Sequence, residues 1–364
     1  MSVRFGVGIV GAGVISDTYL QNLTSFPDLA VRAITDLDPS KASSQAERYD
    51  LDVSGSLPQL LSRDDVDIVV NLTAPTVHVE VGMQAIAAGK HVWSEKPLGV
   101  HRAEARRLLE AAEAAGLRVA CAPDTVLGEG IQSARRLLED GRIGRPINAL
   151  AQMLNPGPEQ WHPSPEFLFQ PGAGPVLDMG PYYLTTLVSL FGGISRVSAT
   201  AQRSHETRVI GSGPRAGEQF SVNTATHVSA LYEFSSGETA QAVFSFDSGV
   251  KRTALEVSGT HGTILLPDPN KFFGDAVVTS QSGQERIPSG DATATRGVGV
   301  VELAQAIHEE RPERASGRLA LHVLDAALAT LEAAESGIPV QLSTTAQAPP
   351  LLPPGWNPRA GVLR

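Results

Sequence analysis

The segment of this sequence that most clearly suggests chemistry is a glycine-rich turn near the N-terminus, Gly11-Ala12-Gly13-Val14-Ile15-Ser16. It follows the apolar run Phe5–Val10, which predicts a strand, and it precedes a predicted helix. Gly11 suits the tight turn, Gly13 lets a pyrophosphate approach the main chain, and Ser16 stands where a third small residue is needed for close helix–strand packing. The turn predicts a dinucleotide site. An ordinary tight turn between strand and helix is the alternative.

An acidic residue at the end of the second predicted strand, Ala30–Asp36, supports the dinucleotide interpretation. Asp36 stands roughly 20 residues beyond the turn, where a carboxylate accepts hydrogen bonds from the ribose hydroxyls. An acid there repels the 2′-phosphate of NADP, and the adjacent Leu37 adds no positive charge. We therefore expect NAD, with NADP as the alternative because Arg32 and Lys41 are close in sequence.

Two further segments lie just past predicted strand ends, where open α/β sheets bind their ligands. They are Thr73-Ala74-Pro75-Thr76-Val77-His78 and Gly89-Lys90-His91-Val92-Trp93-Ser94-Glu95-Lys96-Pro97. These segments therefore belong to the same candidate site as the glycine-rich turn.

Alternating short apolar strands and helical patterns position these residues in the first third of the chain. The expected strands are Phe5–Val10, Ala30–Asp36, Ile68–Leu72, His91–Ser94 and Arg118–Cys121, with helices that include Val79–Ala88 and Ala103–Ala115. This alternation is typical of a doubly wound parallel sheet, the α/β Rossmann class. We expect a dinucleotide-binding domain over residues 1–123.

The pattern after that domain changes to an α+β arrangement, predicted over residues 124–364 with a large, open, mostly antiparallel sheet. After a helix at Ile131–Asp140, hairpins are expected from His227–Phe234 with Thr239–Phe246 and from Ala254–Ser258 with Thr263–Leu266. The polar segments Ser204–Gln219 and Thr279–Arg296 are predicted to be loops, and Val300–Glu309 and Leu319–Ser336 to be helices that pack back towards the first domain.

The composition limits the function classes. A chain of 364 residues usually divides into two domains, and a net charge of -10 argues against nucleic acid as a partner. The single cysteine, Cys121, can form neither an internal disulfide nor a thiolate cluster, and no metal-ligand spacing is evident. Without a signal-peptide pattern or a membrane span, we expect a cytoplasmic protein with no membrane partner and no metal.

Several of these motifs together make the sequence similar to the Gfo/Idh/MocA family of sugar and cyclitol oxidoreductases. The likeness rests on Gly11-Ala12-Gly13, Asp36, Pro75 with His78, and above all Glu95-Lys96-Pro97, and it continues through Gly174–Tyr182 and the region Arg311–Leu324. The expected cofactor contacts are Gly11, Gly13, Val14, Ile15, Asp36, Leu37, Thr73, Ala74, Pro75, His78, Glu95, Lys96 and Pro97.

The resemblance also implies a catalytic set. Lys96 matches the family lysine beside the nicotinamide and the reacting carbinol, and Asp178 matches the acid that orients the base or the substrate. The family's usual histidine base, four residues after that acid, is Tyr182 here. Branches such as those of glucose–fructose oxidoreductase and dimeric dihydrodiol dehydrogenase carry tyrosine there. Tyr182 needs its pKa of about 10 lowered to act as a base, for which the Lys96 cation is the obvious means.

Loss of catalysis, with Tyr182 as a core aromatic residue, is the alternative, and Tyr183 is a second candidate for the base. Substrate contacts are expected from Lys96, Asp178, Tyr182, Asp124, Trp161 and His162. Asp124 would equally suit a plain turn, and Trp161 with His162 a loop packed on the sheet. His322 lies on an apolar helix and is expected to be a core histidine.

The resulting hypothesis is an NAD-dependent dehydrogenase that moves hydride between the nicotinamide and a secondary alcohol or carbonyl of a sugar, cyclitol or glycoside. Tyr182 would be the acid/base, Lys96 its electrostatic partner and Asp178 the orienting residue. The alternatives are glycoside cleavage through transient oxidation, a non-catalytic sugar or dinucleotide sensor, and a sugar–sugar oxidoreductase with tightly held cofactor. By resemblance we expect a homodimer or homotetramer.

Overall fold

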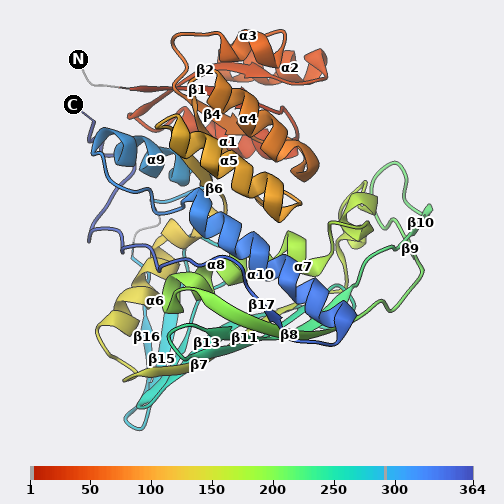
Figure 1. The fold of residues 1–364 in the computed structure, drawn as a ribbon, viewed down its shortest axis with the longest axis vertical. Helices are drawn as coiled ribbons and strands as arrows, with labels where there is room; N and C mark the ends of the chain where they lie inside the picture. Colours follow the sequence, from red (N-terminus) through yellow and green to blue (C-terminus); the bar gives the residue numbers. More distant parts are fainter. Residues whose placement is uncertain (1–3, 291–292, 364) are drawn as a thin grey trace. The chain divides into compact units, whose positions relative to one another are not determined.

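The computed structural model describes residues 4–290 and 293–363, which fall into two compact units (Figure 1). The first unit extends to residue 129 and also takes in the described parts of 291–321 and 349–364. The second unit comprises Gly130–Gly290 and His322–Ala348. Parts of the predicted second domain, 124–364, thus belong to the first unit. Asp291 and Ala292, inside the predicted loop Thr279–Arg296, lie outside the described residues.

The first unit is built on a parallel sheet with the strand order β3-β2-β1-β4-β5-β6. The strands are β1 (Phe5–Val10), β2 (Leu29–Thr35), β3 (Asp52–Val53), β4 (Ile68–Asn71), β5 (His91–Ser94) and β6 (Val119–Cys121). The predicted bounds of β1 and β5 are correct, those of β4 and β6 differ by one residue at one end, and those of β2 differ by one residue at both ends. This sheet confirms the doubly wound α/β class.

Helices lie on both faces of the parallel sheet. They are α1 (Val14–Leu23), α2 (Pro39–Tyr49), α3 (Leu57–Leu61), α4 (His78–Ala87), α5 (Arg102–Ala114) and, much later in the chain, α9 (Val298–His308). Side chains from α1 and α9 share one apolar core with β1, β4 and β5. Because the central strands are covered on both faces, all four residues of β4 are buried.

The second unit contains a larger, mostly antiparallel sheet with the order β16-β15-β14-β13-β7-β12-β11-β8-β17, in which β12 and β7 pair in parallel. The strands are β7 (Pro146–Leu154), β8 (Ile194–Gln202), β11 (His227–Phe234), β12 (Thr239–Ser245), β13 (Arg252–Gly259), β14 (Gly262–Leu265), β15 (Ala276–Ser280), β16 (Gly283–Ile287) and β17 (Val340–Gln341). Both predicted hairpins, β11–β12 and β13–β14, are present. The predicted α+β sheet is confirmed.

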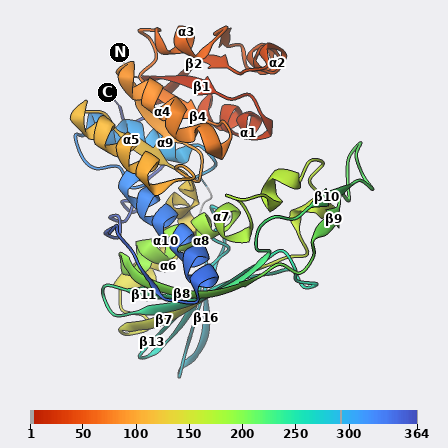
Figure 2. The ribbon, with the colours of Figure 1, turned by 45° about the vertical axis from the view of Figure 1, so that its right-hand side comes forward.

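The two segments predicted to be loops in this unit are partly strands, which corrects the sequence interpretation. Ser204–Gln219 contains β9 (Thr207–Val209), which pairs with β10 (Gln219–Ser221) in a separate hairpin (Figure 2). Thr279–Arg296 contains the end of β15 and all of β16. Four of the five β16 residues are exposed, so this edge strand lacks the apolar alternation that signals a strand.

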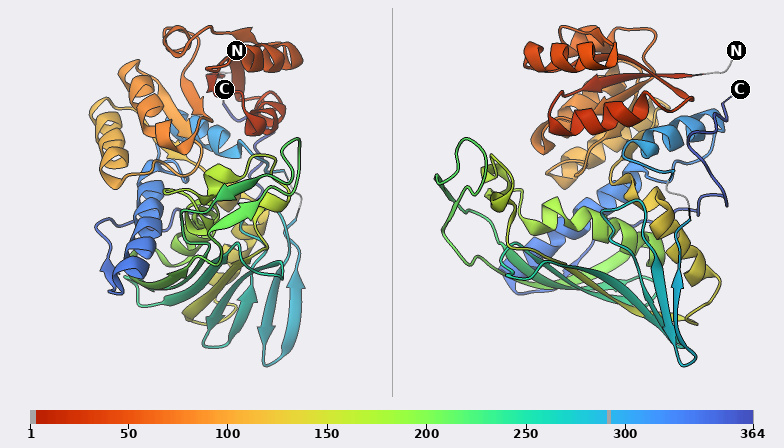
Figure 3. Two further views of the ribbon diagram at one scale, coloured as in Figure 1. Left: turned by 90° about the vertical axis from the view of Figure 1, so that its right-hand side faces the viewer. Right: turned by 180° about the vertical axis from the view of Figure 1, so that it is seen from behind.

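Helices α8 (Gly180–Phe191) and α10 (Gly317–Ser336) lie along one face of the large sheet (Figure 3). The hydroxyl of Tyr232 on β11 is 2.9 Å from that of Thr330 on α10, and Tyr183 on α8 packs edge-on against Phe244 on β12. Helix α6 (Glu129–Glu139) and the short α7 (Pro175–Asp178) complete this layer. Among the described residues, no helix is long and apolar enough to cross a membrane.

Candidate functional site

The glycine-rich turn joins β1 to α1 and has the geometry that a bound dinucleotide needs. Gly11 has φ +104°, and a Cβ there would come within 2.9 Å of the Leu72 carbonyl, so only glycine fits. A Cβ on Gly13 would meet no atom within 4 Å, so packing does not explain this glycine, and the space beside it is open. Ser16 is fully buried, and its hydroxyl donates to the Gly13 carbonyl at 2.6 Å.

Open space beside the N-terminal end of a helix is what a pyrophosphate requires, because the helix amides and dipole attract anions. Gly13 is the N-cap of α1 and has no side chain to occupy that position. Val14, the first helical residue, is 96% exposed. The turn therefore fits a dinucleotide.

Asp36 follows β2 directly, and its carboxylate accepts two hydrogen bonds from main-chain amides. Its Oδ2 accepts the Ala12 amide of the turn at 2.6 Å, and its Oδ1 accepts the Asp38 amide at 2.8 Å. Asp36 remains partly exposed, and Leu37 beside it is fully exposed. Each carboxylate oxygen keeps a second lone pair, so Asp36 can hold the turn and still accept a ribose hydroxyl.

The loops after β4 and β5 are joined through the buried side chain of His78. Its Nδ1 lies 2.7 Å from the Pro97 carbonyl and its Nε2 lies 2.9 Å from the Thr73 carbonyl. Burial lowers the pKa of His78, although the two carbonyls favour the charged form. With only 1% of its surface exposed, His78 fixes the two loops. We therefore assign it a positioning role, in place of the direct cofactor contact expected from the sequence.

The segment Glu95-Lys96-Pro97 begins where β5 ends. The Glu95 amide donates to the Asn71 carbonyl of β4 at 2.9 Å, and the Glu95 carboxylate accepts the Lys96 amide at 3.0 Å. The same carboxylate accepts the hydroxyl of Tyr19 on α1 at 2.9 Å. The main chain at Lys96 is thus tied to two neighbouring elements, and its side chain is partly exposed at the carboxyl edge of the sheet.

In the second unit, Asp178 ends α7 and Tyr182 lies in the first turn of α8. Gly174, with φ +89°, places the start of α7 close to the Ala225 carbonyl. A Cβ on residue 174 would lie 3.0 Å from that carbonyl oxygen. Met179 keeps near-helical angles between the two helices, so Asp178 and Tyr182, four residues apart, lie about one turn apart on the same side. Tyr182 is 8% exposed, and Asp178 is partly exposed.

Tyr183, the second candidate for the base, and His322, the expected core histidine, both form hydrogen bonds inside the second unit. Tyr183 is fully buried, its hydroxyl donates to the Gln152 carbonyl at 3.2 Å, and burial raises its pKa well above the ordinary value, which disfavours it as a base. His322 accepts the Ile194 amide through Nε2 at 2.9 Å, and burial lowers its pKa to about 4. His322 is the core histidine that the sequence predicted.

Asp124 occupies a structural position within the first unit. Its carboxylate is fully buried, pairs with Arg296 at 3.0 Å, and accepts the amides of Gly297 at 2.7 Å and Gly299 at 3.3 Å. Burial raises the pKa of Asp124, and the Arg296 guanidinium opposes that shift. These contacts fix the start of α9 and give Asp124 a structural role, and its expected contact with the substrate stays a prediction.

Trp161 and His162 lie on the surface of the second unit, before α7. Trp161 is 69% exposed and Phe167 is 56% exposed, and the His162 ring lies between them at centroid distances of 5.5 and 5.4 Å. This exposed aromatic group is available to a ligand. Sequence patterns missed an ion cluster in the same unit, where buried Arg208 bonds Glu159 at 2.5 Å and also pairs with Asp247.

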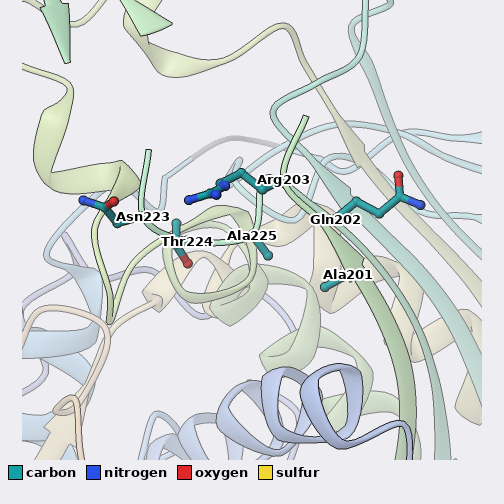
Figure 4. Close-up of a pocket in the computed structure, with 6 residues that line it drawn as sticks. All are labelled: Ala201, Gln202, Arg203, Asn223, Thr224 and Ala225. Atoms are coloured by element: carbon teal, nitrogen blue, oxygen red, sulfur yellow. The ribbon is translucent and has the colours of Figure 1, made fainter. Parts of the chain in front are cut away.

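The same unit has a shallow depression of about 250 Å³ beside the last residues of β8 and the segment before β11 (Figure 4). It is lined by Ala201, Gln202, Arg203, Asn223, Thr224 and Ala225. Arg203 donates to the Val222 carbonyl at 2.8 Å and lies 3.9 Å from Glu206. Among the described residues, no group of three or more His, Cys, Asp or Glu side chains could hold a metal ion.

A doubly wound sheet whose carboxyl edge carries a glycine turn, an acid after β2 and a lysine after β5 defines a dinucleotide-binding protein of the oxidoreductase type. The comparisons with known proteins agree. A family model described as an oxidoreductase family with an NAD-binding Rossmann fold matches residues 5–122, and the GFO/IDH/MocA C-terminal domain matches residues 131–265. This chain therefore belongs to the GFO/IDH/MocA oxidoreductase family, as the sequence predicted, and residues 5–122 form its NAD-binding domain.

Relatives along most of the chain include trans-1,2-dihydrobenzene-1,2-diol dehydrogenase of Bos taurus, which is 27% identical over 85% of this chain and 88% of its own. A 1,5-anhydro-D-fructose reductase of Ensifer adhaerens is 25% identical over 93% of this chain and 98% of its own. Levoglucosan dehydrogenase, solved with NADH and levoglucosan, has the same fold, with a TM-score of 0.80 at 18% identity over 93% of this chain and 99% of its own. The oxidoreductase class and the nicotinamide cofactor are thereby confirmed.

Proposed function

We propose that this protein transfers hydride between NAD and a secondary alcohol or carbonyl of a sugar, cyclitol or glycoside. The observation that carries the proposal is the convergence of the Gly11 turn, Asp36 and Lys96 at one edge of the NAD-binding sheet. Ligands of open α/β sheets bind at that edge. The rest of the proposal concerns what each side chain contributes.

Cofactor binding is assigned to the turn and to the strand ends around it. The main chain at Gly13 and the first turn of α1 would hold the pyrophosphate, and Asp36 would accept the hydroxyls of the adenosine ribose. The loops fixed by His78 would hold the remaining half of the dinucleotide beside Lys96. When bound, the nicotinamide supplies the hydride acceptor or donor.

Proton transfer is assigned to Tyr182, with Lys96 and Asp178 as its partners. In the oxidation direction Tyr182 takes the hydroxyl proton of the substrate, and in reduction it returns that proton to the carbonyl oxygen. The Lys96 ammonium stabilises the developing alkoxide and favours the ionised form of the tyrosine. Asp178, one helical turn from Tyr182, orients the substrate hydroxyl.

The preference for NAD over NADP follows from the surroundings of Asp36. A 2′-phosphate would face the Asp36 carboxylate and the uncharged Leu37. The two basic side chains that could offset this repulsion lie near acids, since Arg32 is 3.9 Å from Asp65 and Lys41 is 4.0 Å from Asp38.

The substrate class is inferred from the surface of the second unit and from the relatives. The exposed rings of Trp161 and Phe167, with the partly buried His162 ring between them, suit the apolar face of a six-membered ring with hydroxyls at its edge. Two relatives are named for a dihydrobenzenediol and an anhydrofructose, which are both ring compounds bearing oxygen functions. We therefore expect a cyclic polyol or glycoside as substrate.

Self-association through the open face of the large sheet is also proposed. A cross-strand row on that face runs through Leu231, Gln241, Leu150, Glu256 and Leu265. Leu231 is 38% exposed and Leu265 is 39% exposed. Exposed leucines in a paired row suit burial against a second copy of the chain, as a homodimer or homotetramer.

The proposed activity is tested by following NADH and NADPH formation with a panel of aldoses, cyclitols, anhydrosugars and glycosides. We expect turnover of at least one cyclic polyol with NAD, and a lower kcat/KM with NADP. Glycoside cleavage without net NADH, or absence of turnover in a protein that binds NADH, would refute the proposal. A tenfold preference for NADP, about 1.4 kcal/mol in the opposite direction, would refute the role given to Asp36.

A further inference from the structure

A buried chain of hydrogen bonds connects the helix of the glycine turn to the main chain of Lys96. Trp93 on β5 donates its indole N–H to the hydroxyl of Tyr19 on α1 at 3.1 Å. The Tyr19 hydroxyl donates to Glu95 Oε1 at 2.9 Å, and Glu95 Oε2 accepts the Lys96 amide at 3.0 Å. All these residues belong to the first unit.

The Tyr19 hydroxyl is held in its role as donor by its surroundings. Tyr19 and Trp93 are fully buried, so water cannot replace the hydrogen bond between them. Burial raises the pKa of Tyr19 well above its ordinary value, and the charges of Glu95 and Asp124 raise it further against the opposing Arg296. The phenol therefore stays protonated and keeps donating to Glu95 over the working pH range of an enzyme.

The two ends of this series of hydrogen bonds suggest that Tyr19 has a role beyond packing. Tyr19 lies on α1, whose first turn adjoins the open space at Gly13, and Glu95 immediately precedes Lys96. Glu95 is only partly buried, and its own amide is already used by Asn71. Tyr19 is therefore the side chain that fixes one oxygen of this carboxylate and leaves the other for the Lys96 amide.

We propose that Tyr19 is a positioning residue for Lys96: by fixing the Glu95 carboxylate, it couples the placement of helix α1 to that of the lysine. The inference rests on the role proposed above for Lys96. If the hydroxyl is removed, Glu95 loses its fixed orientation and turns towards the ammonium group of its neighbour. The carboxylate then offsets part of the positive charge of Lys96, so the substrate alkoxide and the ionised Tyr182 are stabilised less. It also favours the charged form of Lys96, so its amine becomes less reactive at a given pH.

The test compares Tyr19→Phe with Tyr49→Phe in the full-length protein. Tyr49 is a matched control because its hydroxyl bonds α1 at Asp17 Oδ1, at 2.8 Å, from the neighbouring helix α2. Both variants remove one phenolic hydroxyl that joins α1 to another element, and only the hydroxyl of Tyr19 contacts Glu95. NADH binding, thermal unfolding, kcat, KM and the pH profile of kcat are measured for each.

For Tyr19→Phe we expect kcat to fall at least about tenfold with its pH profile displaced upward, and the NADH Kd to stay within about threefold. Tyr49→Phe should behave as the unmodified protein. The titratable and charged groups that bear on this profile are Glu95, the buried His78 and Cys121, and the Asp124–Arg296 pair near Tyr19. Unchanged kcat and profile in folded Tyr19→Phe, or the same loss in Tyr49→Phe, would overturn the inference.

A readout without turnover separates this inference from the proposed function. The rate at which Lys96 is acylated by an amine-reactive ester, followed by mass spectrometry across pH, reports the state of the amine directly. A slower rate in Tyr19→Phe alone supports the positioning role, even if no sugar is oxidised, and an unchanged rate overturns it. Should Tyr19→Phe fail to fold, Glu95→Gln must change the acylation profile, and an unchanged profile would likewise overturn the inference.

Discussion

Substituting Gly13 by alanine should separate cofactor binding from folding. A Cβ at this position meets no atom within 4 Å, and the backbone has φ −74°, which alanine adopts freely. The weaker N-cap preference of alanine costs about 0.5–1 kcal/mol, and the reduced entropy of the unfolded chain offsets about 0.4–1 kcal/mol of it. The free energy of unfolding should therefore change by less than about 1 kcal/mol.

The effect on the cofactor should be much larger. If the open space beside Gly13 receives the pyrophosphate, the added methyl group blocks the approach of the phosphates to the main chain. We expect the NADH Kd, measured by fluorescence titration, to rise at least about tenfold, or 1.4 kcal/mol. Gly249→Ala, at an exposed site that is equally open, is the control and should leave Kd unchanged. An unchanged Kd in Gly13→Ala would refute the reasoning.

The remaining predictions concern stability and assembly. The pKa of His322 is about 4 in the folded protein against 6.5 unfolded, so the unfolded state binds the extra proton, and stability should fall by about 3 kcal/mol as the pH drops from 6.5 to 4. Urea unfolding should show a shallower acid slope for His322→Gln, and an equal slope would contradict this. Leu231→Lys should lower the molar mass in light scattering if the open sheet face self-associates, and an unchanged mass would exclude this face.

The sequence was informative where local patterns coincide with buried strands. The parallel strands β1 and β5 are short, apolar and bounded by turns, and their predicted limits match the structure. The turn from Gly11 to Ser16 and the Glu95-Lys96-Pro97 segment were found because each motif is contiguous. The edge strand β16 was missed because its side chains are polar and mostly exposed.

Contacts between distant segments could not be predicted from the sequence. His78 was recognised as part of a motif, but its two carbonyl partners, at Thr73 and Pro97, depend on how β4 and β5 end side by side. Asp124 suited a cleft edge by position, and only the fold shows α9 amides bonded to its carboxylate. Residue type and spacing thus identified the candidate segments. Only the packing of the fold shows which of their side chains, such as His78 and Asp124, hold other parts of the structure in place.

The central claim is that Lys96 and Tyr182 act together in proton and hydride transfer. The most direct test is the kcat of Lys96→Met, Tyr182→Phe and the double variant on the best substrate of the panel, with NADH binding as a control. We predict a loss of about 10²–10⁴-fold for each single variant, and a double variant little worse than either. Turnover within about threefold of the unmodified protein in Lys96→Met, with NADH still bound, would contradict the account.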